Sequence, residues 1–443
     1  MAPDTLGKSK SLRIVHVVPN FIPEGHGGLE RHVSSISREM SARHDVYVIA
    51  FTNNLELIEH NTTRQGDVKV IWLQKRQNIG DMMPPECPEL DARLREAITS
   101  IAPDVVHIHY LAGLSTGIVG VAKDVARAVL ITLHDYASLC PGDTIDCAGK
   151  LCFSPGTRCL SCLHPSQFSR KRLMGYWRIT NPAMILFSRV FGNWPMAKVI
   201  ADLSTRKTVH FKALEQANVI IAPSHAIADV FIGAGLAAER VKVITHGTDK
   251  VLGVPHDRPL HNPLRFGFIG SNRLKGFELL HRAYGKIADN RTELHVFGNQ
   301  YYPASSRTNS WIKKVGSVDH GRFDPDDINQ VYERFDMLVA PSIWIEPFGL
   351  VALEALARGV PVIATNRGGF TECVKDGVNG LLFELGDVEE LSRALRRCVE
   401  EPGLVERLKC GIGTVKSTAE QALELEELYT LCLAIDGDKT CRE

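Results

Sequence analysis

The sequence predicts an α/β protein with two domains, each built around a mainly parallel sheet. Apolar runs of strand length alternate with helical segments along most of the chain, which is the pattern of repeated strand–helix–strand units. A length of 443 residues with 44% hydrophobic residues is enough for two sizeable cores. The proline-rich stretch at residues 254–263 predicts the linker between the two domains.

Composition and charge exclude some classes of function. Lys plus Arg and Asp plus Glu both number 51, so no overall positive field favours nucleic acid, and we expect no nucleic-acid partner. No apolar run reaches the ~18–20 residues of a membrane span, and residues 1–20 lack the long apolar core of a signal peptide. These features predict a cytoplasmic protein, whose eleven cysteines should be reduced or metal-bound.

Residues 336–369 predict one strand–helix–strand unit. Residues 337–340 are an apolar run, a proline-containing loop follows, and residues 349–358 are helical by composition. Residues 360–364 then predict a second, parallel strand. In such a unit the loop after the first strand and the helix N-terminus share one edge, where amide groups and the helix dipole favour an anion. The unit therefore predicts a phosphate-binding site.

Two carboxylates belong to this predicted site. Glu346 lies in the loop, and Glu354 lies about one turn into the helix. Glu354 shares a helical face with Leu350 and Leu353, so on a buried face its carboxylate would need partners such as sugar hydroxyls. The alternative is an exposed ion pair with Arg358 four residues later. The apolar residues around Glu354 favour the first interpretation.

Three motifs in this segment carry a resemblance: E-P-F-G-L-x-x-x-E, then A-x-G-V-P-V-I-A, then G-G-x-x-E. Together they resemble the signature of the family-four retaining glycosyltransferases. The resemblance implies a GT-B fold, in which two Rossmann-like domains face each other across a cleft and the C-terminal domain holds most of a nucleotide-sugar donor. It also implies donor binding by Phe348, Gly349, Leu350 and Val351.

The resemblance also sets the expected domain bounds. We expect an N-terminal domain at residues 1–250, a C-terminal domain at residues 264–415, and a final helix at residues 416–443 that crosses back to the N-terminal domain. The runs VIIAPS and VKVITHGTD resemble the family's last two landmarks before the linker. After Gly380 the sequence predicts helix to about Leu433.

The N-terminal domain begins with a buried strand at residues 12–18, after which the chain turns through Gly25, Gly27 and Gly28 into a helix. Glu30 stands where a G-x-G-x-x-G dinucleotide motif would have its last glycine, so the signal for NAD is weak. The resemblance implies that Gly27 and Gly28 close over the donor diphosphate. The alternative is an ordinary tight turn.

Further apolar runs predict strands at residues 46–51, 68–73, 104–109 and 130–133, and the last of them ends at His134. A histidine at the carboxyl end of a strand can donate a hydrogen bond to a reacting sugar. The family carries a cleft histidine at the corresponding place. The alternative is a purely structural histidine.

Five of the eleven cysteines lie close together, at Cys140, Cys147, Cys152, Cys159 and Cys162. Cys159 and Cys162 have C-x-x-C spacing, so with Cys140 and Cys152 they could hold a structural zinc ion or an iron–sulfur cluster. The alternative is a set of reduced thiols. A catalytic cofactor is not expected there, because glycosyl transfer includes no redox step.

Residues 165–215 are rich in positive and aromatic side chains. The positive residues are Arg170, Lys171, Arg172, Arg178, Arg189, Lys198, Arg206, Lys207 and Lys212. This combination suits an anionic membrane surface, which predicts peripheral contact with the inner face of the membrane and a glycan or lipid-linked acceptor. The alternative is a solvated face whose apolar side packs on the core.

The second domain begins with a strand at residues 264–270, followed by the sequence GSNRLKG. Arg273 and Lys275 beside free amides can hold a diphosphate and stabilise it as a leaving group. The glycine follows the lysine, so this is not a Walker A loop. Lys275 matches the family pattern, whereas Ser271 takes the place of an arginine for which Arg273 could substitute. The run LHVFG ends at Gly298, where the family's nucleotide passes.

These observations predict a retaining glycosyltransferase that moves a sugar from a nucleotide-diphosphate donor to an acceptor hydroxyl, in polysaccharide or glycolipid assembly. His134, Glu346 and Lys275 would act in catalysis, with Glu346 on the sugar hydroxyls and Glu354 on the ribose. No cofactor is required, because cationic side chains and amides would stabilise the leaving group. The competing interpretation is a partner subunit of the same fold that binds nucleotide sugar without turnover, supported mainly by Ser271.

Overall fold

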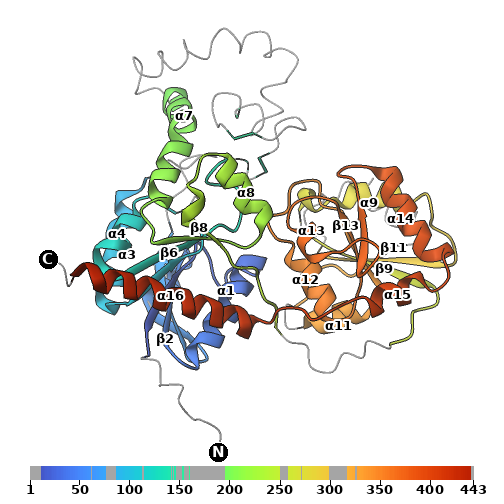
Figure 1. Cartoon of the computed structure of the whole chain (residues 1–443), viewed down its shortest axis with the longest axis horizontal. Helices are drawn as coiled ribbons and strands as arrows, with labels where there is room; N and C mark the ends of the chain where they lie inside the picture. The colour runs from blue at the N-terminus through green and yellow to red at the C-terminus, as the bar shows by residue number, and fades with distance from the viewer. Residues whose placement is uncertain are drawn as a thin grey trace, which may run out of the picture. The chain divides into compact units, whose positions relative to one another are not determined.

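The chain forms two compact units (Figure 1). The structure is a computed structural model that describes residues 11–60, 62–75, 86–111, 114–140, 195–249, 258–270, 272–298, 317–324 and 327–440, and also residues 142, 144–145, 152–153 and 159. Unit 1 holds Met1–Pro223, Ile227–Ile244 and Gln421–Glu443, and unit 2 holds Ser224–Ala226 and Thr245–Glu420. The end of the chain therefore belongs to the same unit as its beginning.

Unit 1 contains an eight-stranded sheet in the order β3-β4-β2-β1-β5-β6-β7-β8. The strands are β1 (Arg13–Val17), β2 (Asp45–Thr52), β3 (Thr62–Gln65), β4 (Val68–Gln74), β5 (Val105–Ile108), β6 (Ala128–Thr132), β7 (Val219–Ala222) and β8 (Val241–Val243). All neighbours are parallel except β3 and β4. β5 and β6 are buried along their whole length, as expected of parallel strands covered on both faces.

Helices surround this sheet, and α7 extends away from it (Figure 1). They are α1 (Gly28–Ser41), α2 (Leu55–His60), α3 (Pro88–Ile101), α4 (Ile118–Val125), α7 (Pro195–Leu214), α8 (His225–Gly233) and α16 (Thr418–Thr440), with a short helix η1 (Ala238–Arg240). The last helix, α16, packs Leu425 and Tyr429 into the core cluster that contains Val48 and Val70. This packing makes the C-terminal helix a structural part of unit 1.

Unit 2 contains a six-stranded parallel sheet in the order β11-β10-β9-β12-β13-β14. The strands are β9 (Leu264–Ile269), β10 (Thr292–Phe297), β11 (Ser317–Asp319), β12 (Met337–Ala340), β13 (Val362–Thr365) and β14 (Gly380–Phe383). The helices are η2 (Arg273–Lys275), α9 (Phe277–Tyr284), α11 (Ile328–Glu333), α12 (Leu350–Ala357), α13 (Phe370–Cys373), α14 (Val388–Glu400) and α15 (Leu404–Cys410). Two buried clusters form its core, one on Phe266 and Phe268 and the other on Phe335 and Leu338.

One sequence expectation, continuous helix after Gly380, is wrong. Residues 380–383 form strand β14, paired with β13 in the sheet. A Cβ on Gly380 would lie 2.1 Å from the Val362 carbonyl oxygen, so only glycine lets β14 begin against β13. Asp387 then starts α14 by accepting hydrogen bonds from the amides of Glu389 and Glu390, at 2.8 and 3.0 Å.

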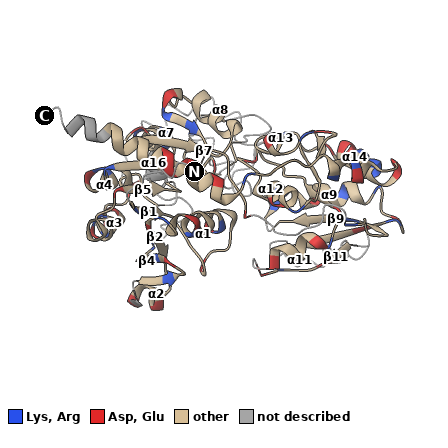
Figure 2. Ribbon diagram, turned by 60° about the horizontal axis from the view of Figure 1, so that its bottom comes forward, with Lys and Arg blue, Asp and Glu red and all other residues tan. Residues whose placement is uncertain are grey.

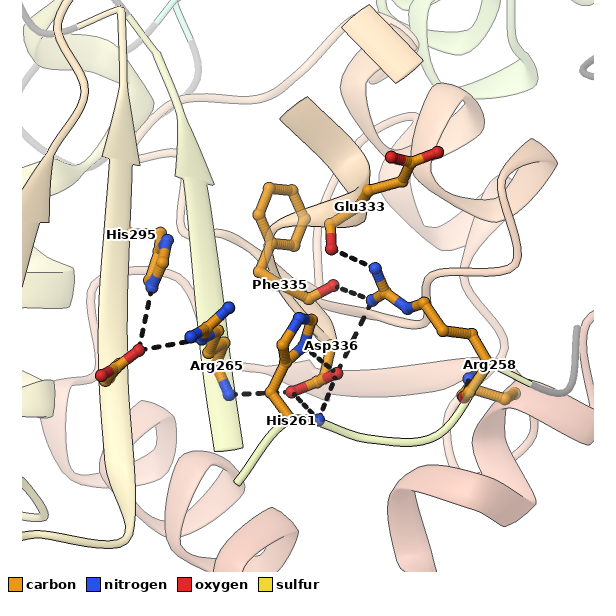
Figure 3. Close-up of polar contacts among 9 residues, drawn as sticks. Arg258, His261, Arg265, His295, Glu333, Phe335 and Asp336 are labelled. Carbon is orange, nitrogen blue, oxygen red and sulfur yellow. Dashed lines mark hydrogen bonds and ion pairs between the residues drawn. The ribbon is translucent and has the colours of Figure 1, made fainter. Parts of the chain in front are cut away.

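Asp336 anchors the start of β12 (Figure 3). Its side chain is fully buried and accepts hydrogen bonds from the amides of His261 and Arg265, at 3.1 and 2.9 Å. The His261 ring nitrogen Nδ1 lies 2.8 Å from the same carboxylate, and the Arg258 guanidinium lies 3.6 Å away. These contacts fix the chain entering β9 against the beginning of β12, whose other end carries the candidate site.

The basic stretch lies largely outside the described residues, including Arg170, Lys171 and Arg172. Arg206, on α7, is buried and donates to the Ala137 carbonyl at 2.9 and 3.2 Å, so it is not part of an exposed basic face. Elsewhere positive and negative residues are interspersed, as on α14 (Figure 2). No helix within the described ranges combines the length and apolar character needed to cross a bilayer.

Candidate functional site

In unit 2 the loops that follow β9 and β12 touch each other. Both strands are parallel neighbours, so their carboxyl ends lie at the same edge of the sheet. The amide of Ile343 donates to the Leu274 carbonyl at 2.8 Å. Gly276 has φ +78°, and a Cβ there would lie 1.9 Å from the Pro341 carbonyl oxygen. Glycine at residue 276 is thus required for the two loops to meet.

This contact between the loops brings together two of the predicted site residues, Lys275 and Glu346. Lys275 Nζ lies 2.8 Å from Glu346 Oε1. The other carboxylate oxygen, Oε2, accepts hydrogen bonds from Ser342 Oγ at 3.0 Å and from Trp344 Nε1 at 2.8 Å. Glu346 is only 7% exposed, so its negative charge depends on these three partners.

Sequence reasoning did not name Ser342 or Trp344. Lys275 Nζ also lies 5.8 Å from the centre of the Trp344 ring, so the indole holds both members of the ion pair. Ser342 and Trp344 could have been predicted from their position, because both lie in the same short loop as Glu346. Thr365 supports the loop from β13 by donating to the Ser342 carbonyl at 2.9 Å.

The two glycines of the G-G-x-x-E motif hold the Glu346 backbone. The Gly369 amide donates to the Glu346 carbonyl at 2.8 Å. Gly368 has φ +66°, and a Cβ there would lie 2.4 Å from the same oxygen. A side chain at residue 368 would therefore push the Glu346 loop away from its place.

The N-terminus of α12 follows this loop directly. Gly349 is the N-cap, with φ +91° and no side-chain cap, and a Cβ there would lie 2.5 Å from the Phe370 ring. Phe348 is buried beside it. Leu350 and Val351 begin the helix, and the first amides of a helix have no partner within it. Together with the helix dipole they give this corner a preference for an anion.

Glu354 is half-buried on α12. The Tyr332 hydroxyl donates to its Oε2 at 3.2 Å and to the Val351 carbonyl at 3.0 Å. Arg358 is buried, and its Nη1 donates to the main-chain oxygen of Glu354 at 3.0 Å while its Nε donates to Asn329 at 2.9 Å. The ribose-binding role of Glu354 stays a prediction.

The remaining predicted residues of unit 2 lie on the neighbouring turns. Arg273 is exposed in η2, where the Asn272 side chain accepts from the Lys275 amide at 3.3 Å. Gly298 directly follows β10 with φ +81°, and a Cβ there would lie 3.2 Å from the Gly270 carbonyl oxygen. Ser271 lies outside the described residues.

In unit 1 the glycine turn leads into α1, which begins at Gly28 with Gly27 as its N-cap. A Cβ on Gly27 would lie 2.5 Å from Oε2 of Glu30. His32, on the second turn of α1, has its ring centre 5.7 Å from that of His134. The turn and the predicted histidine are therefore close together in unit 1.

His134 follows the carboxyl end of β6 and is half-buried. Its Nε2 lies 3.1 Å from Nδ1 of His109. Burial, reinforced by the charge of His32, lowers the pKa of His134 well below its ordinary value. Burial raises the pKa of the neighbouring Asp135 to about 6, although its carboxylate accepts a hydrogen bond from the Ala137 amide at 2.8 Å.

The predicted metal site is described only in part. Cys140, Cys152 and Cys159 are described, whereas Cys147 and Cys162 lie outside the described residues. Burial raises the pKa of the Cys140 thiol. Over the ranges that are described, one group of side chains has the spacing of a metal site, and it consists of His16, His107 and His109. The cysteine site stays a prediction.

Two family models match the chain. Residues 26–251 match the model of Glycosyltransferase Family 4, and residues 260–411 match the model of Glycosyl transferases group 1. The second match contains every predicted site residue of unit 2, and the first contains Gly27, Gly28 and His134.

Curated relatives match shorter stretches. The D-inositol 3-phosphate glycosyltransferase of Streptomyces griseus is 34% identical over 170 residues, which cover 35% of each chain. Spore coat protein SA of Bacillus subtilis is 31% identical over 135 residues, 28% of this chain and 36% of that protein. The chain thus spans about a third of the length of these two relatives.

Solved structures match over nearly the whole chain. HepE from Anabaena, crystallised with UDP and glucose, is 20% identical with a TM-score of 0.61, covering 95% of this chain and 99% of its own. Sucrose-phosphate synthase from Thermosynechococcus elongatus is 18% identical with a TM-score of 0.66, covering 96% and 100%. These likenesses confirm the predicted GT-B fold with two Rossmann-like domains.

Proposed function

Since the chain belongs to glycosyltransferase family 4, we propose that it transfers a sugar from a nucleotide-diphosphate donor to an acceptor hydroxyl, with retention at the anomeric carbon. The contact between Lys275 and Glu346 beside the N-terminus of α12 is the observation that carries this proposal. It joins a cation, a carboxylate and helix amides at one edge of a parallel sheet, which suits a diphosphate linked to a sugar. The relatives named as glycosyltransferases, and the UDP and glucose bound by HepE, also support it.

Lys275 and the amides of Gly349, Leu350 and Val351 would hold the diphosphate. As the bond from the sugar to the diphosphate breaks, negative charge develops on the departing phosphate, and fixed cations and amides stabilise that charge. Arg273 is exposed on the same turn and would add a second cation.

Glu346 would accept hydrogen bonds from hydroxyls of the donor sugar. Its carboxylate is neutralised by Lys275 in the structure. Donor binding would give Lys275 a phosphate partner and leave Glu346 with Ser342 and Trp344, so that sugar hydroxyls replace the lost contact. Glu354 would bind the ribose through its carboxylate.

In unit 1, His134 would donate a hydrogen bond to the reacting sugar, and the turn at Gly27 and Gly28 would cover the diphosphate. The departing phosphate would accept the proton of the acceptor hydroxyl. The new bond then forms on the face that the leaving group vacates, which retains the configuration.

The acceptor is proposed to be a glycan or a lipid-linked sugar, as in polysaccharide or glycolipid assembly. Positive residues at Arg170, Lys171 and Arg172 would bring the chain to the anionic inner face of a membrane. Charge reversal of these three residues should weaken binding to anionic vesicles without changing donor affinity. Unchanged vesicle binding would remove the membrane from the proposal.

The test of the function has two steps. A thermal-shift screen of UDP, GDP, ADP and their sugars identifies the donor, because a ligand of the folded state raises the melting temperature. Hydrolysis of that donor by the purified protein then measures transfer to water. Stabilisation by a nucleotide sugar with no sugar released would favour the non-catalytic partner subunit, and no stabilisation by any of them would contradict both readings.

A further inference from the structure

Three buried histidines lie on one face of the unit 1 sheet. His16 on β1 and His107 on β5 are register partners on neighbouring parallel strands, and His109 follows on the same face two residues later. The rings of His107 and His109 stack with their centres 4.0 Å apart. Both nitrogens of His107 are occupied, Nδ1 by the Tyr429 hydroxyl at 2.7 Å and Nε2 by the Thr132 hydroxyl at 2.6 Å.

His109 connects His16 to His134. Its Nε2 lies 2.9 Å from Nδ1 of His16, and its Nδ1 lies 3.1 Å from Nε2 of His134. Both are hydrogen-bond distances. The three rings therefore form a continuous chain from the buried strand β1 to the carboxyl end of β6.

The rings of His16, His109 and His134 are all neutral near pH 7. Burial, followed by the charge of His32 on α1, lowers the pKa of His16 to about 3. Burial likewise lowers the pKa values of His109 and His134 well below the ordinary value. A neutral imidazole has one N–H and one bare nitrogen. Each contact between two of these rings thus needs a donor on one ring and an acceptor on the other.

This requirement couples the tautomers of the three rings. If Nδ1 of His16 carries the proton, it donates to Nε2 of His109, whose own proton must then be on Nδ1. His109 in turn donates to Nε2 of His134, so the proton of His134 is on Nδ1. In the opposite arrangement every proton is on the other nitrogen, and Nδ1 of His134 is bare.

The surroundings of His16 favour the first arrangement. Its Nε2 is buried and has no hydrogen-bond partner among the residues that the structure describes. In the first arrangement this atom is a bare nitrogen, and in the second it is an N–H without an acceptor. Buried N–H groups without acceptors are rarer in proteins than acceptors without donors. The proton of His16 is therefore expected on Nδ1.

We propose that His16 and His109 are positioning residues that hold His134 as the tautomer protonated on Nδ1, so that His134 acts as a hydrogen-bond donor from that atom. The tautomer follows from contacts within unit 1 alone. Its use on a donor sugar rests on the proposed function, in which an N–H at this atom stabilises the reacting sugar and a bare nitrogen does not.

Metal binding is the alternative use of this cluster. One ring nitrogen each of His16, His107 and His109 lies within 4.8 Å of the others. However, the 2.9 Å contact between His16 and His109 and the two hydroxyl partners of His107 already pair these nitrogens. Hydrogen bonding therefore accounts for the observed geometry, and it also explains the contact with His134.

Nitrogen NMR of protein labelled with ¹⁵N in its histidine rings tests the proposal, because protonated and bare ring nitrogens resonate far apart. We expect His134, assigned through its loss in His134→Gln, to be protonated on Nδ1. In His16→Leu the donor is gone, so the share of His134 protonated on Nε2 should rise above that of the wild type. His16→Asn should restore the wild-type spectrum, because its amide N–H stands at the same place relative to Cβ as Nδ1 of histidine.

His210→Phe is the matched control. It removes another buried imidazole of unit 1, on α7, whose two nitrogens have no partner among the described residues, and it should leave the His134 signals unchanged. In an active transferase the kcat of the His16 variants should follow the Nδ1-protonated share, with an unchanged KM for the donor.

Three results would overturn the proposal. The first is a wild-type His134 protonated on Nε2, and the second is a His134 spectrum in His16→Leu that is the same as in the wild type. The third is a stoichiometric metal ion bound by His16, His107 and His109. If His16→Leu does not fold, the wild-type spectrum alone decides. A protein with the expected tautomers but no transferase activity would refute the proposed function and leave this inference standing.

Discussion

Lys275 Nζ lies 2.8 Å from Glu346 Oε1, although the two residues are 71 positions apart in the chain. Each residue was predicted to contact a different part of one ligand, Lys275 the diphosphate and Glu346 the sugar. In the structure they neutralise each other. The ion pair therefore stabilises a nearly buried carboxylate.

Replacing Lys275 should destabilise the protein more than replacing Glu346. Lys275→Met leaves Glu346 buried without its cation and should lower the free energy of unfolding by about 1–3 kcal/mol. Glu346→Gln should cost less, because glutamine still accepts from Ser342 and Trp344 and the half-exposed lysine can turn to water. Urea unfolding measures both. A larger loss in Glu346→Gln than in Lys275→Met would contradict this reading of the pair.

The same two variants should separate binding from turnover. Lys275→Met should weaken binding of the nucleoside diphosphate, whereas Glu346→Gln should lower turnover of the nucleotide sugar and leave affinity for the free nucleotide nearly unchanged. Calorimetric titration and initial rates give the two quantities. Wild-type binding and turnover in both variants would show that this corner is not the donor site.

Glu354→Ala tests ribose binding by its magnitude. A carboxylate that binds ribose hydroxyls makes charge-assisted hydrogen bonds of roughly 1.5–3 kcal/mol, so donor affinity should fall about tenfold or more. Tyr332→Phe removes the hydroxyl that contacts Glu354 and should have a smaller effect on affinity. If Glu354 serves only its helix, its loss should change stability by roughly 0.5 kcal/mol and leave donor affinity as it was.

Residues 336–369 could be predicted almost in full, because apolar runs and glycines mark each boundary there. β14 escaped prediction, since four strand residues before a capped helix resemble the helix by composition. Ser342 and Trp344 were missed for another reason. Their roles depend on the contact between the loops after β9 and β12, which Gly276 permits. Contacts between loops distant in the sequence cannot be predicted from local sequence patterns. The link from His16 to His134 likewise exists only once β1, β5 and β6 are neighbours.

Metal analysis tests the predicted cysteine site. Protein purified without chelator should contain close to one equivalent of zinc, or the iron of a cluster, and the double variant Cys159→Ser, Cys162→Ser should lose it. The variant should also melt earlier, because a structural metal contributes folding free energy. Cys410→Ser, at an exposed thiol of α15, is the control. Metal-free protein with reactive thiols in this loop would favour the reduced-thiol alternative.

Asp336→Asn should destabilise unit 2. Its buried carboxylate accepts from the His261 and Arg265 amides and lies close to two further nitrogens. An asparagine presents an NH₂ group to one of these donors, and the loss should be about 1–3 kcal/mol in urea unfolding. Asp376→Asn, at an exposed aspartate that accepts one amide hydrogen bond from Leu382 at 2.8 Å, should cost clearly less. Equal losses would mean that Asp336 does not anchor β12.

His210→Phe should change how stability depends on pH. His210 is fully buried, and burial, followed by the charge of Arg206, lowers its pKa from 6.5 to about 3. Between these values the unfolded chain binds a proton that the folded chain does not. The depressed pKa of His210 therefore makes the free energy of unfolding depend on pH. This free energy is highest above pH 6.5 and decreases as the pH falls towards 3.

The slope of this loss approaches about 1.4 kcal/mol per pH unit. The phenylalanine variant lacks this pH-dependent loss. In urea unfolding between pH 7 and 4.5, its free energy of unfolding should therefore rise relative to that of the wild type by about 1.4 kcal/mol for each pH unit below 6. Other groups cancel in the comparison, including His16, whose pKa is also lowered to about 3, and Asp135, whose raised pKa gives the opposite slope between about 4 and 6. Parallel stability curves for the two proteins would mean that His210 is protonated as readily in the folded chain as in the unfolded one.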